Sequence, residues 1–351
     1  MEKVTILPQT SFLKSRFSPL TLRRWHSFFR QKRAWIGLVG FGSILFFSMT
    51  AEFWSNSKPL YLKRDGVTYF PVFKNYSAST FEITDSFVID YREMIQQDLD
   101  SSKNTISVFP VNPWDPLEQT SQIMVRPSHS HWLGTDSLGR DVTARLLYGL
   151  RVSLSYGLLF WFFCFLIGVT VGLIQGYFAG RTDFLTERLK ELIEILPFLS
   201  VVILVNGLMK SDSFMITLMV VVLFSWSGVA SQLRAQVLTL RKREFVEAAR
   251  GAGAQHARII FTHILPNAAT PILTLTPFTV SGGIATLAVL DYLGFGLSPP
   301  TPSLGELLQQ GRVYIQNAVW LLVAPTVALS WTLISINLIG ESLREAFDPR
   351  K

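Results

Sequence analysis

The sequence carries little charge and a single cysteine. Only 16% of its 351 residues are Asp, Glu, Lys or Arg, while 49% are hydrophobic; soluble proteins usually carry about 25% charged residues. The one cysteine, Cys164, excludes an internal disulfide, and its apolar surroundings favour a packing role over a nucleophilic one. The composition therefore predicts a membrane protein.

Common nucleotide-binding and catalytic motifs are also missing. The chain has no G-x-x-x-x-G-K-[ST] phosphate loop, no H-E-x-x-H and no G-x-S-x-G, so it shows no motif for binding ATP or for those hydrolytic mechanisms. One pair of histidines is close in sequence, His129 and His131, but no cysteine or carboxylate is grouped with it. We therefore expect neither an enzyme nor a metal or cofactor site in this chain.

The sequence does contain long apolar runs. A helix needs roughly 20 mostly apolar residues to cross a bilayer. The candidate runs are Ala34–Phe53, Val152–Phe178, Leu192–Met209, Phe214–Leu233, Ala268–Leu290 and Val319–Gly340. They predict an all-α polytopic membrane protein with six transmembrane helices.

The basic residues set the expected orientation. Residues 1–33 are rich in Lys and Arg and contain one carboxylate, Glu2, and the loop after the fourth run is also basic. Cytoplasmic segments carry such an excess, so both termini are expected in the cytoplasm. Three arginines do not fit this expected orientation, because they fall on the outer side of the second run: Arg140, Arg145 and Arg151. Most of the Lys and Arg residues behind the net charge of +7 lie in segments expected on the cytoplasmic side. The charge is thereby explained by the membrane topology, and nucleic-acid binding is not expected.

The segment between the first two runs, residues 54–131, is rich in aromatic residues. Disordered linkers are poor in them, so this insertion is expected to fold. Within it, "YLKRDGVTYF" places Asp65-Gly66 between strand-like flanks and predicts a β-hairpin. The insertion could be a cap on the outer face, or a surface that meets a partner or gates the pathway.

Glycines recur every four residues at the end of the second run, at Gly168, Gly172, Gly176 and Gly180. This spacing places them near one helix face, where another helix could approach closely. We therefore expect a helix-packing face.

A polar stretch, "EFVEAARGAGAQHARIIFTHILPN", separates the fourth and fifth runs from Glu244 to Asn267. It predicts one short helix that ends near Gly251 and Gly253, then a second from Ala254 to Leu265 that Pro266 closes. The stretch could be an interfacial connector or a docking element for a cytoplasmic partner.

This stretch resembles the signature of permease subunits of binding-protein-dependent ABC importers. The signature has E-A-A, three residues, G, nine residues and I-x-L-P; the chain has Glu247-Ala248-Ala249, Gly253 and Leu265-Pro266. His263 stands in place of the isoleucine, as is usual in the peptide-importer branch, where "HILPN" is a familiar ending.

Other stretches carry the same resemblance. "HWLGTDSLGRDVTARLLYGLRVSL", "LDYLGFGLSPPTPSLGELLQQGR" and "GESLREAFDPR" look like the oligopeptide, dipeptide and nickel branch. In the insertion, "DGVTYFPVFKNYSASTFE" looks like its microcin C and oligopeptide type, whereas residues 84–125 match least clearly.

The resemblance implies a permease subunit that moves peptides or peptide-like compounds, such as microcin C, across the bacterial inner membrane. Its expected partners are a second homologous permease, two ATPase subunits that bind ATP and Mg, and a periplasmic solute-binding protein. The implied organisation is a cytoplasmic N-terminus (1–33), a first helix (34–53), a periplasmic insertion (54–131), a permease domain (132–345, with the coupling loop at 244–267) and a cytoplasmic tail (346–351).

The resemblance also assigns ATPase coupling to one set of residues: Glu244, Glu247, Ala248, Ala249, Gly251, Gly253, Leu265 and Pro266. Glu247 would make polar contacts in the ATPase cleft, the alanines would allow close approach, and Gly253 would permit the bend. Nickel import, an ATP-independent channel or secondary carrier, and a membrane-bound enzyme remain as alternatives.

Overall fold

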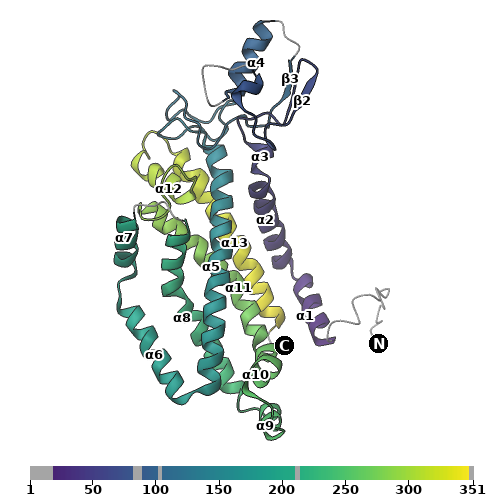
Figure 1. Ribbon diagram of the computed structural model, residues 1–351, viewed down its shortest axis with the longest axis vertical. Helices are drawn as coiled ribbons and strands as arrows, with labels where there is room; N and C mark the ends of the chain where they lie inside the picture. The colour runs from purple at the N-terminus through teal and green to yellow at the C-terminus, as the bar shows by residue number, and fades with distance from the viewer. Residues whose placement is uncertain (1–18, 82–88, 102–104, 210–213, 348–351) are drawn as a thin grey trace.

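The computed structural model describes residues 19–81, 89–101, 105–209 and 214–347. Long helices run roughly parallel along the molecule, and a small layer containing a sheet covers one end (Figure 1). The chain is mostly helical.

Four helical segments among the described residues are long and apolar enough to cross a membrane. They are α5 (Val142–Phe178), α8 (Phe214–Leu240), the segment His256–Tyr292 and α13 (Trp320–Phe347). A bent pair, α6 (Gly180–Ile195) and α7 (Phe198–Met209), makes a fifth if the two count as one span. The structure thus supports four or five of the six predicted spans by length and composition.

The first predicted span corresponds to α2 (Lys32–Met49), which follows α1 (Pro19–Arg30). It lies along α13 (Figure 1). Gly37 makes this approach possible, since a Cβ there would lie 2.8 Å from the Ser335 carbonyl oxygen. The helix therefore packs against the bundle.

The third predicted span, Leu192–Met209, is wrong as a continuous helix. The chain breaks at Leu196-Pro197, and α6 and α7 meet at 71°. Proline lacks the N–H that an uninterrupted helix would use and disfavours helical geometry in the residue before it. Leu196 is accordingly extended, with ψ at 128°.

Three of the four spaced glycines lie against α8. A Cβ on Gly168, Gly172 or Gly176 would come within 2.7 Å of Val229, Ala230 or Val237. Gly180 lies outside this contact: it begins α6 at the corner after α5, with φ +54° and no atom within 4 Å of a Cβ.

The fifth predicted span begins earlier than expected. α10 (His256–Arg258), the π-helix η2 (Ile259–Ile264) and α11 (Leu265–Tyr292) are continuous. Pro266 therefore does not close a helix; it occupies the first turn of α11, where a missing N–H is tolerated. The wider π turns immediately precede it.

The insertion departs from the predicted all-α class. After α3 (Ala51–Trp54), strands β1 (Tyr61–Arg64), β2 (Val67–Tyr69) and β3 (Thr105–Val108) form an antiparallel sheet in the order β2-β1-β3. The turn at Asp65-Gly66 joins β1 to β2, so the predicted hairpin is confirmed. With η1 (Ala78–Phe81) and α4 (Tyr91–Asp100), the sheet encloses a small core that includes Leu62 and Phe81.

Candidate functional site

The polar stretch lies at the end of the bundle opposite the sheet (Figure 1). α9 (Glu244–Gly251) carries one fully buried side chain, Val246, which packs into a cluster that includes Tyr177, Val237 and Ile259. One apolar side chain thus fixes this short helix to the ends of α5, α8 and η2.

Gly253 terminates α9 in a left-handed turn. Its φ is +80°, a conformation that L side chains rarely adopt. The Ala254 N–H donates to the Ala249 carbonyl and the Gly253 N–H to the Arg250 carbonyl, both at 3.0 Å. These two bonds define a Schellman motif, the usual way in which a glycine ends a helix.

The structure divides the predicted coupling residues into three groups. Five are exposed on or just after α9: Glu244, Glu247, Ala248, Gly251 and Gly253. Ala249 is partly buried among the apolar residues beneath the helix. Leu265 and Pro266 lie apart, at the start of α11.

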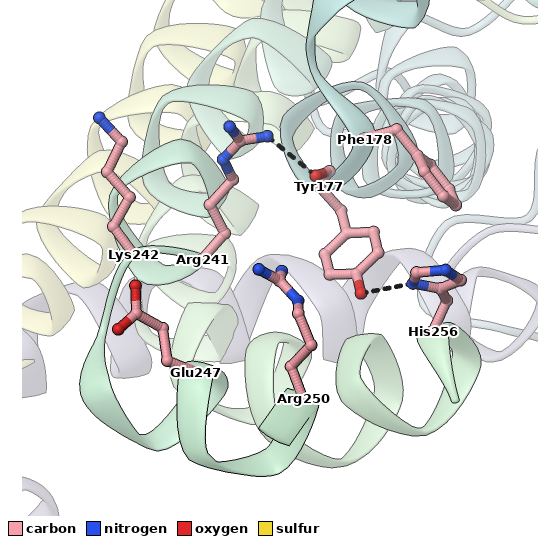
Figure 2. Close-up of a pocket in the computed structure, with 7 residues that line it drawn as sticks. All are labelled: Tyr177, Phe178, Arg241, Lys242, Glu247, Arg250 and His256. Carbon is pink, nitrogen blue, oxygen red and sulfur yellow. Dashed lines mark hydrogen bonds between the residues drawn. The ribbon is translucent and has the colours of Figure 1, made fainter. Parts of the chain in front are cut away.

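A pocket of about 360 Å³ lies between α9 and the end of α5 (Figure 2). Its lining comprises Tyr177, Phe178, Arg241, Lys242, Glu247, Arg250 and His256. Arg241 donates to the Tyr177 carbonyl at 3.0 Å, and the Tyr177 hydroxyl lies 2.7 Å from His256 Nδ1. Sequence reasoning missed this pocket, since Tyr177 lies far from the polar stretch in the chain.

The three arginines that do not fit the predicted orientation each pair with a carboxylate. Arg140 pairs with Asp136 at 2.7 Å and with Glu306 at 2.8 Å, and Glu306 also accepts from Arg145. Glu306 lies on α12 (Leu304–Val313), so the cluster joins the start of α5 to α12. Arg151 binds Glu52 through two hydrogen bonds of 2.6 Å.

The hydrogen bond from Arg151 lowers the pKa of the Glu52 carboxyl below its ordinary value of 4.5, and partial burial opposes this shift. Glu52 therefore stays ionised at neutral pH. Each of these three arginines thus has a carboxylate partner.

His131 is a buried structural residue. Its Nδ1 lies 2.8 Å from Asp141 Oδ2, and its ring stacks on Trp114. Asn112 donates to the other oxygen of Asp141 at 2.8 Å, and Asp141 caps α5. The residues around His131 thus join the insertion to α5.

A second ionic cluster, which sequence reasoning missed, links α5, α6 and α8. Arg234 binds Asp183 at 2.5 and 2.7 Å, and Lys190 binds Glu187 at 2.7 Å. Buried Gln175 donates to both carboxylates. The i, i+4 spacing of Asp183 and Glu187 was the available signal, since it places both on one helix face.

Residues 168–351 match the family described as "Binding-protein-dependent transport system inner membrane component". Over 361 residues the chain is 36% identical to the peptidoglycan transport system permease protein YejE of Agrobacterium fabrum, covering 95% of this chain and 94% of that one. It is also 36% identical to the inner membrane ABC transporter permease protein YejE of Escherichia coli, covering 96% and 99%.

A dipeptide transport system permease protein, DppC of Haemophilus influenzae, is 32% identical and covers 68% of this chain and 83% of its own length. The chain therefore belongs to the family of inner membrane components of binding-protein-dependent ABC transport systems.

Proposed function

We propose that this chain is a permease subunit that translocates peptides or peptide-like compounds across the bacterial inner membrane, driven by separate ATPase subunits. A second homologous permease and a periplasmic solute-binding protein complete the transporter. ATP and Mg are bound by the ATPase partners.

The observation that carries this proposal is the geometry of α9. Buried Val246 fixes the helix to the bundle, while Glu244 and Ala248 face outward. A rigid end at Gly253 sets its direction. A short helix that is anchored on one face and free on the other suits a cytoplasmic partner that must push or pull on the bundle.

The proposed topology has six spans, with α2 as the first and the α6–α7 pair as the third. α2 has 18 residues, about 27 Å at 1.5 Å per residue, close to a bilayer core of about 30 Å. In Figure 1, α1, α9 and the end of α13 lie at one end, and the sheet lies at the other. This arrangement supports a periplasmic insertion and cytoplasmic termini.

The cargo proposal rests on the relatives. Those with the greatest coverage include proteins named for peptidoglycan and dipeptide transport, and others are named for glutathione and oligopeptides. These compounds share amide-linked amino acids. A peptide-like antibiotic such as microcin C fits the same class.

Co-purification tests the subunit proposal. Tagged full-length chain is extracted in mild detergent from its native host, and bound proteins are identified by mass spectrometry. We expect an ATPase and a second permease. Ala248→Trp, on the exposed face of α9, should lose the ATPase, whereas Ala257→Trp, exposed on α10, should retain it.

Uptake measurements distinguish the remaining alternatives. Cells lacking the chain should lose ATP-dependent uptake of a labelled tripeptide and regain it from a plasmid copy. Uptake of labelled nickel in place of peptide would favour the nickel importer. Solute movement into vesicles containing only this chain, without ATP, would favour a channel or carrier and refute the proposal.

A further inference from the structure

The pocket between α9 and the end of α5 contains more positive than negative charge. Arg241, Lys242 and Arg250 line it, against the single carboxylate of Glu247. Within the described ranges, the side chains of Lys242, Arg250 and Glu247 have no hydrogen bond or ion pair with another residue. Arg241 makes one hydrogen bond, to a neutral carbonyl. Three basic side chains in the pocket thus face one carboxylate, and none of them is ion-paired with it among the described residues.

In the proposed topology the pocket lies at the cytoplasmic end of α5. Arg151 lies nine residues into α5 and binds Ser48 and Glu52 near the end of the first proposed span, and Phe178 ends α5 27 residues later. At 1.5 Å per residue this is about 40 Å, against about 40–45 Å for a bilayer with its headgroups. Phe178, at the edge of the pocket, is 49% exposed.

We propose that this pocket binds the phosphate group of an anionic phospholipid in the inner leaflet. The guanidinium groups of Arg241 and Arg250 point into the same space (Figure 2), and guanidinium binds phosphate through paired N–H donors. Basic pockets between transmembrane helices on the cytoplasmic side bind anionic headgroups. The volume of about 360 Å³ falls within the range of ligand pockets, about 300–1,000 Å³.

A bound phosphate would also affect α9. Arg241 precedes the helix and Arg250 lies in its last turn, so one anion between them would hold both ends of this segment to α5. The inference rests on the proposed orientation of the chain, which places this end at the cytoplasmic surface.

Native mass spectrometry of the purified full-length chain, titrated with phosphatidylglycerol or phosphatidylcholine, tests the site. We expect selective binding of phosphatidylglycerol. Arg241→Gln and Arg250→Gln should each weaken it about fivefold, the usual contribution of one cation near an anionic membrane surface. Arg250→Lys should restore only part of the affinity, because lysine keeps the charge but lacks the paired N–H donors. Arg243→Gln is the matched control, because Arg243 is exposed in the same loop and does not line the pocket.

Three results would overturn the proposal. Equal weakening by all three glutamine variants would mean general surface attraction. Displacement of the lipid by millimolar inorganic phosphate would assign the site to a soluble anion. Unchanged lipid affinity with loss of ATPase co-purification would assign it to a protein contact. A failure of the transport proposal is separate, since a channel would still bind the lipid here.

Discussion

Replacing Gly253 should uncouple transport without disturbing the membrane helices. A Cβ at this position meets no atom within 4 Å, so a new side chain does not clash. The cost comes from the backbone: an L residue held at φ +80° loses about 1–2 kcal/mol. That is a factor of about 5–30 in the population of the turn.

Gly251 is the matched control for this prediction. It is exposed, and a Cβ there also meets open space, but it lies within α9 and does not have a positive φ. Peptide uptake by complemented cells should fall in the order Gly253, Gly253→Asn, Gly253→Ala, Gly253→Val, because Asn tolerates the left-handed region best. Gly251→Ala should reduce uptake less than Gly253→Ala, because it changes no positive φ.

Gly253→Asp adds a carboxylate to the exposed face and should abolish uptake while the protein still inserts. Membrane insertion is checked by immunoblotting of washed membranes. Equal effects of alanine at positions 251 and 253, or normal uptake by well-expressed Gly253→Val, would refute the reasoning.

Three further predictions concern stability, measured as thermal unfolding of the detergent-purified chain. Glu306→Gln leaves buried arginines partly unpaired and should cost about 3–5 kcal/mol; a loss below about 1 kcal/mol would contradict this. Gly172→Leu forces a side chain against α8 and should cost at least about 1–3 kcal/mol, whereas Gly228→Ala, with open space, should not. The pKa of Glu52 is lowered in the folded state. Glu52 therefore stabilises the protein at pH values above its ordinary pKa, and this contribution is lost on acidification. In the Arg151→Gln variant, the decline in stability between about pH 5 and 3 should be flatter.

The sequence predicted those features that depend on residues close together in the chain. Apolar length located α5, α8, α11 and α13, and Asp65-Gly66 located the hairpin. The end of α9 near Gly253 was also predictable, because a glycine supplies the positive φ that the turn requires.

Contacts between distant segments could not be predicted in this way. The partners of Arg140 and Arg145 include Glu306, more than 160 positions away, and no local pattern indicates that pairing. Similarly, Glu194 on α6 is exposed and accepts a hydrogen bond from Ser227, 33 positions away. The buried polar residues of that region are Gln175 and Lys190.

α10, η2 and α11 form one continuous helical segment, which can act as a lever. The joined helix has 37 residues, about 55 Å at 1.5 Å per residue. Its outer end is tied to α12, since Asp291 accepts hydrogen bonds from Ser303 and from the Leu297 N–H. A tilt of about 5° around that end would move the opposite end by about 5 Å over this length. A small rotation of this helix thus produces a displacement at its far end of about the spacing between neighbouring β-strands, about 4.8 Å.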